Sequence, residues 1–172
     1  MIAIKEIVVA TDFGDSAAVA LTYGRNFARA FDASLHIVHV VNDLAASAPV
    51  SEIPMDLTRV QAQLDTEART SLDALVTDDD RRTLKVTRTL LTSSTPAREI
   101  LAYATDVKAN IIIVGTHGRG GLAEFFLGSV AQKVVRSAPC PVLTVRTHER
   151  DFVAPDALSV VAASSSNAPK VG

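Results

Sequence analysis

Five short runs of apolar, mostly β-branched residues, separated by longer stretches with helical spacing, constrain the fold more than any other feature of the sequence. A strand buried on both faces is a continuous apolar run, whereas a surface helix places apolar residues three or four positions apart. Strands that alternate with helices favour a parallel sheet with right-handed crossovers. The chain is therefore predicted to be an α/β protein, a single doubly wound domain with helices on both faces of the sheet. The predicted strands are Ile4 to Thr11, Ser34 to Val41, Lys85 to Leu91, Ile111 to Val114 and Pro141 to Arg146.

The stretches between these strands predict four helices and one long loop. Asn42 to Ile53 contains Ala, Ser and Pro without periodicity and is predicted to be the loop. Asp15 or Ser16 is the expected cap of the first helix, and Thr95 with Pro96 is a typical helix start. The predicted helices run from Asp15 or Ser16 to Phe31, from Asp56 to Thr77, from Pro96 through Ala104, and from Ser129 to Ser137.

The length of 172 residues suits one domain, and its scarce aromatic residues (5%, with no Trp) predict an aliphatic core. We expect the domain to cover residues 1–147. Residues 148–172 are rich in Ala, Ser, Val and Pro without a period and are predicted to be a flexible C-terminal tail.

The charge pattern argues against nucleic acid as a partner. The formal net charge is −2, and binding to a phosphate backbone requires a concentrated basic face. Arg81 and Arg82 form a basic pair, but they follow Asp78, Asp79 and Asp80, so the run is predicted to be a solvated turn.

The sequence also favours a cytoplasmic location. The first ten residues lack the apolar region of a signal peptide, and no apolar stretch approaches the length of a membrane span. The single cysteine, Cys140, cannot form an internal disulfide, which fits a reducing compartment.

Five of the eight glycines fall between Gly115 and Gly128, directly after the fourth predicted strand. Such glycines let backbone N–H groups converge on an anion, and the following helix adds its positive N-terminal end. Gly118 belongs to this phosphate loop, the Ser129 hydroxyl can donate to a phosphate oxygen, and Arg119 can neutralise part of its charge. The alternative is that the glycines only form a long turn and Ser129 only caps a helix.

Asp12 ends the first strand, at the edge where ligands bind in open α/β sheets. Its carboxylate can accept a hydrogen bond from the adenine amine or a ribose hydroxyl; alternatively, it caps the first helix. Val40 and Val114 are expected at neighbouring strand ends, where they can sandwich a purine ring or simply belong to the core.

The segments IKEIVVATDFGDSA and GTHGRGGLAEFFLGSVAQKVVRSAPCPVLTVR resemble the universal stress protein family, and the resemblance covers roughly residues 1 to 147. Gly115, Gly118, Gly128 and Ser129 match the family's nucleotide-binding pattern. The resemblance implies a five-stranded sheet of order 3-2-1-4-5 and places ATP between two groups of residues. Adenine would lie near Asp12 and Val40, and phosphates along Gly118, Gly128, Ser129 and Val130; Ala10, Thr11, Val114 and Gly115 also match pocket positions.

The resemblance further implies an ATP-binding stress-response regulator whose nucleotide occupancy modulates an unidentified protein partner. It implies a homodimer through the last strand, Val142 to Arg146, whose edge would pair across a twofold axis. The chain departs from the family at Ser93-Ser94, where many members have Gly, and in its long tail. Whether Mg²⁺ accompanies ATP stays open, because nothing fixes the loop carboxylates Asp43, Glu52 and Asp56 near a phosphate.

Efficient catalysis is not indicated. The sequence has no GxxxxGK[ST] motif, and His117 is the only histidine near the glycine loop that is placed to orient a water molecule. The turn Thr11 to Ser16 shares only its final Asp-Ser with the pyrophosphate loop of ATP pyrophosphatases. His36 and His39 are interpreted as structural. The alternatives left open are slow ATP hydrolysis and a dimeric interaction module that does not depend on nucleotide.

Overall fold

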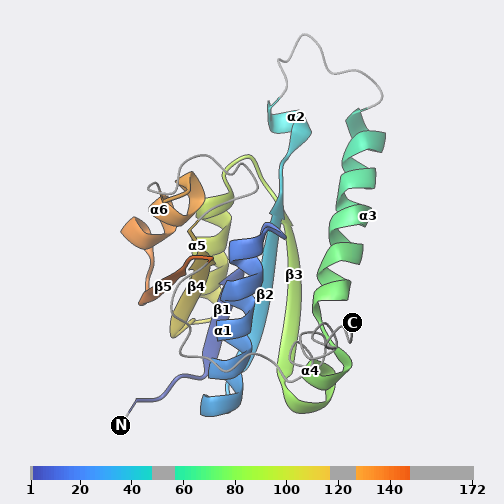
Figure 1. Cartoon of the computed structure of the whole chain (residues 1–172). Helices are drawn as coiled ribbons and strands as arrows, with labels where there is room; N and C mark the ends of the chain where they lie inside the picture. Colours follow the sequence, from blue (N-terminus) through green and yellow to red (C-terminus); the bar gives the residue numbers. More distant parts are fainter. Residues whose placement is uncertain (1, 48–56, 117–126, 148–172) are drawn as a thin grey trace, which may run out of the picture.

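A five-stranded parallel sheet forms the centre of the protein (Figure 1). The computed structural model describes residues 2–47, 57–116 and 127–147, so the predicted tail, 148–172, lies outside the described residues. The strand order is β3-β2-β1-β4-β5, which confirms the order that the family resemblance implied. The strands are β1 (Glu6–Ala10), β2 (Ser34–Val41), β3 (Lys85–Thr92), β4 (Ile111–Gly115) and β5 (Val142–Val145).

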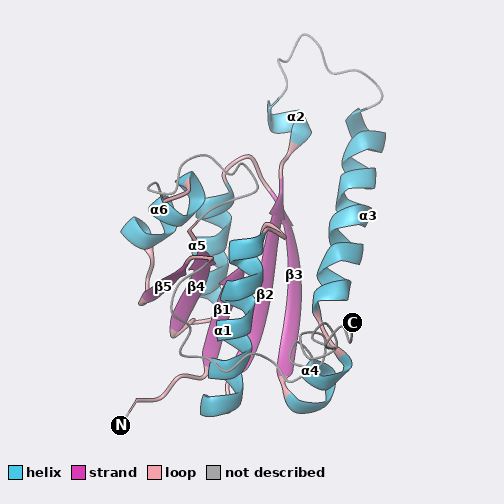
Figure 2. Ribbon diagram, viewed as in Figure 1, coloured by secondary structure: helices cyan, strands magenta, loops and turns pink. Residues whose placement is uncertain are grey.

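Helices cover both faces of this sheet (Figure 2). Helices α1 and α3 pack on one face, and α5 and α6 pack on the other. The fold is therefore the doubly wound arrangement predicted from the alternation of strands and helices. The helices are α1 (Asp15–Phe31), α2 (Leu44–Ser47), α3 (Leu57–Leu75), α4 (Asp78–Thr83), α5 (Pro96–Asp106) and α6 (Ser129–Ser137).

The central strand β1 joins two hydrophobic clusters. Ile7 and Val9 belong to the cluster under α1 and α3, and Val8 belongs to the cluster under α5 and α6. Successive strand residues point to opposite faces, and all three side chains are 0% exposed. Helix α1 packs closely because Gly24 has no side chain: a Cβ there would lie 2.5 Å from Val9 Cγ2. A continuous apolar strand sequence is thus explained by burial on both sides.

The charged run 78–82 is not the predicted solvated turn. It forms the short helix α4, which begins with a capping box between Thr77 and Asp80. The Asp80 carboxylate is buried, lies 2.9 Å from Arg25 Nε and 3.3 Å from Arg29 Nη2, and also accepts from the Thr77 amide. The prediction failed because two cations from α1, distant in sequence, stabilise a carboxylate in the interior.

Two further predictions about local structure need correction. The predicted loop Asn42 to Ile53 contains helix α2, where the Asp43 carboxylate accepts from the Ala46 amide and Gln61 Oε1 accepts from the Leu44 amide. Residues 48–53 of that predicted loop lie outside the described residues. Helix α1 is capped by Gly14 with no side-chain hydrogen bond, so neither Asp15 nor Ser16 is its cap. Asp15 instead lies in the first turn, where its charge favours the helix dipole.

A network of polar side chains is centred on His36 and links neighbouring strands of the sheet. Its Nε2 lies 2.8 Å from Glu6 Oε2 and its Nδ1 lies 2.9 Å from the Tyr103 hydroxyl, which also accepts from Thr89. The network joins β1, β2, β3 and α5, and it satisfies a nearly buried imidazole. The structural interpretation of His36 agrees with these contacts.

No helix in the described part of the chain is long and apolar enough to cross a membrane.

Candidate functional site

The winding of the chain changes direction between β1 and β4. Ala10 of β1 is paired with Val114 of β4, and the two strands end at the same edge of the sheet. From there the chain continues into α1 on one face and, after β4, into α6 on the other. Ligands in open α/β sheets bind at such a switch point.

The turn that follows β1 is fixed by its own side chains. Thr11 Oγ1 accepts from the Phe13 amide at 3.0 Å, and Asp12 Oδ1 accepts from the Gly14 amide at 3.0 Å. Phe13 has a φ of 64°, a left-handed conformation that costs a bulky residue about 1 kcal/mol or more. Asp12 therefore fixes the turn before α1 with one oxygen but does not cap the helix, whose N-cap is Gly14, and it stays partly exposed at the sheet edge.

His39, near the end of β2, holds this turn from the side. Its Nδ1 lies 2.7 Å from the Thr11 carbonyl oxygen, and its ring centroid is 4.3 Å from that of Phe13. Because a carbonyl oxygen only accepts, Nδ1 carries the proton and donates. The structural interpretation of His39 is correct, but the sequence did not indicate that its contacts meet the candidate site.

Gly115 allows the end of β4 to approach the start of α1. A Cβ at this position would lie 2.4 Å from Ser16 Oγ, 2.7 Å from Ser16 C and 2.9 Å from the Ala17 amide nitrogen. Two of these three atoms belong to the backbone and cannot move aside alone. The first glycine of the cluster therefore has a packing role as well as its predicted place beside a ligand.

The ends of the glycine-rich segment meet through the backbone. The Gly128 amide donates to the Thr116 carbonyl at 2.7 Å, and the Thr116 amide donates to the Val145 carbonyl at 2.8 Å. Gly128 is the N-cap of α6, so Ser129 is the first helical residue and not the cap. Ser129 is exposed, whereas the predicted Gly118 and Arg119, together with His117, lie outside the described residues.

The first hydrogen bond within α6 runs from the Gln132 amide to the Gly128 carbonyl at 2.9 Å. The amides of Ser129, Val130 and Ala131 precede this bond and point out of the N-terminal end of the helix. They form the positive end of the helix dipole, next to an exposed hydroxyl at Ser129. The described structure thus provides N–H donors on the α6 side and a carboxylate on the β1 side.

Val40 and Val114 were expected at neighbouring strand ends, but the strands that carry them are not adjacent. Strand β1 lies between β2 and β4, because the switch point makes β1 the central strand. Both valines belong to the cluster under α5 and α6, but Val114 is only 3% exposed and Val40 is partly exposed. Val114 is therefore a buried residue beneath the candidate site. Val40 follows Val38, the residue that pairs with Ala10, so Val40 lies past the end of β1.

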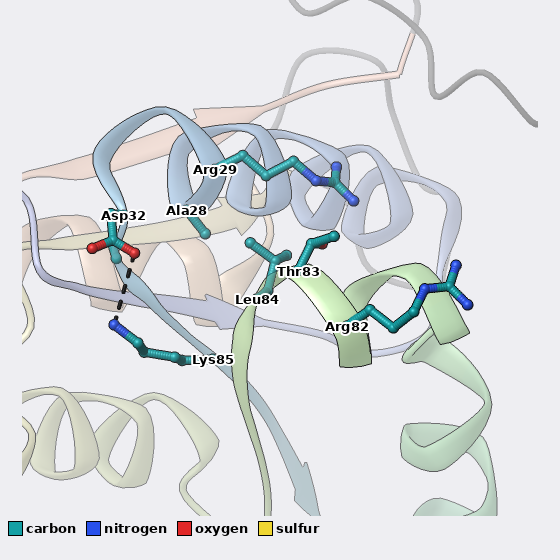
Figure 3. A pocket seen from close by; sticks show the side chains of 8 residues that line it. Ala28, Arg29, Asp32, Arg82, Thr83, Leu84 and Lys85 are labelled. Carbon is teal, nitrogen blue, oxygen red and sulfur yellow. Dashed lines mark ion pairs between the residues drawn. The ribbon is translucent and has the colours of Figure 1, made fainter.

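A separate cavity of about 270 Å³ lies at the opposite edge of the sheet (Figure 3). It is lined where α1 ends and β3 begins, by Arg29, Arg82, Lys85 and Asp32 among others. Its cations pair with acidic neighbours: Lys85 with Asp32, and Arg29 and Arg82 with Asp79. Cations at the ends of α1 and α4 also complement the negative ends of these helices. This cavity is not the predicted site.

The described residues offer little for covalent or metal chemistry. They contain no group of three or more His, Cys, Asp or Glu side chains that could hold a metal ion. Burial raises the pKa of the Cys140 thiol, while a hydrogen bond with the Ile112 backbone partly lowers it. The thiol is therefore largely protonated at neutral pH, unlike an activated nucleophile.

Comparison with known proteins shows the family and agrees with the fold. The profile of the universal stress protein family matches residues 3–146. The chain belongs to the universal stress protein family. A universal stress protein of Methanocaldococcus jannaschii is 31% identical over 147 residues, which cover 86% of this chain and 85% of that protein.

Solved structures of the family share the fold. The universal stress protein UspA from Lactobacillus plantarum superposes with a TM-score of 0.69 at 27% identity, covering 85% of this chain and all of that one. A universal stress protein from Archaeoglobus fulgidus, solved in complex with dAMP, gives a TM-score of 0.56 at 22% identity, covering 84% of this chain and 99% of that one. The second likeness is one of fold alone.

Proposed function

We propose that this universal stress protein binds ATP at the β1–β4 edge and acts as a nucleotide-dependent regulator. The observation that carries the proposal is that the paired strands β1 and β4 end at one edge of the sheet, where β1 leads to Asp12 and the hydrogen bond from Gly128 to Thr116 holds the N-terminal end of α6 beside β4. Adenine nucleotides need both an acceptor for the exocyclic amine or ribose hydroxyls and donors for the phosphates. The universal stress protein of Archaeoglobus fulgidus that shares this fold was solved in complex with dAMP, which supports the choice of an adenine nucleotide as the ligand.

Not every backbone N–H group around the start of α6 is available to donate to a phosphate. Gly128 uses its amide for the Thr116 carbonyl, so its contribution to phosphate binding is the space it leaves at the cap of α6. The amides of Ser129 and Val130 and the Ser129 hydroxyl are the donors that fit a phosphate. Gly118 and Arg119 complete the proposed phosphate loop, and Ala10, Thr11, Val40, Val114 and Gly115 form its surroundings.

Bound ATP supplies negative charge at the end of α6 and a purine at the end of β1. The residues of the protein bind and orient it, and the proposal includes no catalytic step. We also propose a cytoplasmic homodimer through β5, which is the outermost strand of the sheet on this side. An outer strand presents N–H and C=O groups that pair across a twofold axis.

Binding is tested by matched serine variants of α6. Ser129→Ala removes an exposed hydroxyl at the N-terminal end of the helix, and Ser137→Ala removes one at the C-terminal end. We expect wild-type protein to bind ATP with a Kd on the order of 1 μM, and Ser129→Ala to bind about tenfold more weakly. Ligand released from purified protein is identified by mass spectrometry, and the emptied protein is titrated by calorimetry.

Ser137→Ala should bind ATP as the wild type does, and Gly118→Val should abolish binding because its side chain fills the proposed loop. A folded wild-type protein that releases no nucleotide and gives no heat with ATP would contradict the proposal. The interaction module that does not depend on nucleotide would then be the better description.

Regulation requires that ATP favours one conformation of a surface that a partner contacts. We expect ATP to slow amide hydrogen exchange in residues 42–55 and 115–128 by about tenfold or more, and to leave exchange in α3 unchanged. Equal exchange with and without saturating ATP would remove the regulatory part of the proposal while leaving nucleotide binding intact.

A further inference from the structure

His39 contacts the candidate site from outside the predicted set of binding residues. Its neighbour Val40 lies in the cluster under α5 and α6, and successive strand residues alternate between faces. His39 therefore lies on the α1 side of the sheet, where its ring packs against Phe13 at 4.3 Å. The imidazole touches the turn at two points, the Thr11 carbonyl and the Phe13 ring.

We propose that His39 is a positioning residue for the nucleotide site, which fixes the direction of the Asp12 carboxylate by holding the residues on either side of it. The inference deepens the proposed function and rests on it. His39 itself need not touch the nucleotide. It acts on the two residues that flank Asp12 in the chain.

The backbone of Phe13 adopts a conformation that needs support. Its φ of 64° is disfavoured for a residue with a bulky side chain, so contacts elsewhere must maintain it. The imidazole packs against its ring, and the Thr11 hydroxyl accepts from its amide. Loss of the imidazole would leave this conformation with less support.

The second contact of His39 holds Thr11, the residue that precedes Asp12 in the chain. The Thr11 amide donates to the Val38 carbonyl at 2.9 Å, which extends the ladder between β1 and β2. The Thr11 carbonyl then turns toward His39 Nδ1, so the chain leaves the ladder at a defined angle. With both neighbours held, the peptide units on each side of Asp12 are fixed, and its side chain is directed by the Gly14 amide.

The proton on Nδ1 makes this contact independent of the charge on the ring. The neutral tautomer with a proton on Nδ1 and the imidazolium both donate to the Thr11 carbonyl. A side chain with a donor near the position of Nδ1 can therefore replace the hydrogen bond. Asparagine places its amide nitrogen there, whereas leucine keeps apolar volume without a donor.

The test compares His39→Leu with His39→Asn and uses His36→Leu as a control on the same strand. We expect His39→Leu to weaken ATP binding about tenfold, and His39→Asn to recover part of that loss. In His39→Leu without nucleotide, the Phe13 and Gly14 amides should exchange about tenfold faster or more than in wild type. His36→Leu should leave both readouts unchanged, after correction for global stability measured by urea unfolding.

The outcomes separate the two proposals. A wild-type protein that does not bind ATP contradicts the proposed function, and exchange at Phe13 and Gly14 then still decides whether His39 holds the turn. Wild-type ATP affinity and wild-type exchange in His39→Leu would overturn the positioning role. It would also be overturned if leucine and asparagine reduced affinity equally and in proportion to their loss of global stability.

Discussion

Replacing Asp80 by alanine is expected to lower the free energy of unfolding by about 3–5 kcal/mol, because it removes one partner from a buried ion pair. The side chain of Asp80 is 2% exposed and that of Arg25 is 12% exposed. The substitution leaves the Arg25 guanidinium in a largely dry environment and also removes half of the capping box at Thr77. Urea unfolding followed by circular dichroism measures the change.

Asp78→Ala is the matched control for this prediction. Asp78 lies in the same charged run, but its side chain is 88% exposed and its pair with Arg81 spans 3.7 Å. Exposed pairs contribute about 0–1 kcal/mol, so this variant should unfold close to wild type. Similar stabilities for the two variants would show that the Arg25–Asp80 pair does not stabilise the fold as argued.

Replacing Gly115 by alanine is expected to destabilise the protein by about 1–3 kcal/mol, the usual cost of overpacking a close contact. The new methyl group would approach Ser16 and Ala17 at the start of α1, so β4 and α1 would have to separate. The same separation would displace the turn after β1. Thermal or urea unfolding gives the stability, and ATP titration of the folded variant reports the site.

Combining Ser16→Ala with Gly115→Ala shows which atoms cause the loss of stability in Gly115→Ala. The double variant removes the Ser16 hydroxyl, but the backbone atoms at 2.7 and 2.9 Å remain. We therefore expect the double variant to recover only a small part of the lost stability. Full recovery would mean that the hydroxyl alone, and not the path of the backbone, requires glycine at this position.

The strands were predictable because burial on both faces leaves a direct trace in the sequence. IVV in β1 and IIIV in β4 are apolar at every position, and this pattern does not depend on a distant residue. The strand order came from the resemblance of two longer segments to a family. Local patterns alone do not determine which strands are adjacent, and so Val40 and Val114 were wrongly expected on neighbouring strands.

The missed features depend on partners far along the chain. Asp80 is buried because Arg25 and Arg29 reach it from positions 55 and 51 residues earlier in the chain. Part of the sequence signal for helix α4 was local, since Thr77 and Asp80 have the spacing of a capping box. His39 had no comparable signal, because its role depends on the path of the chain after Thr11.

The hydrogen bond between Thr116 and Gly128 bears on how such a fold can diversify. It joins two backbone groups, so this contact does not itself depend on the side chains of the residues between its two ends. The entropy of closing a loop grows only slowly with its length. A change in the number of residues between Thr116 and Gly128 therefore costs the closure of this contact little. The sheet and the proposed phosphate loop can therefore diverge at different rates within one short chain.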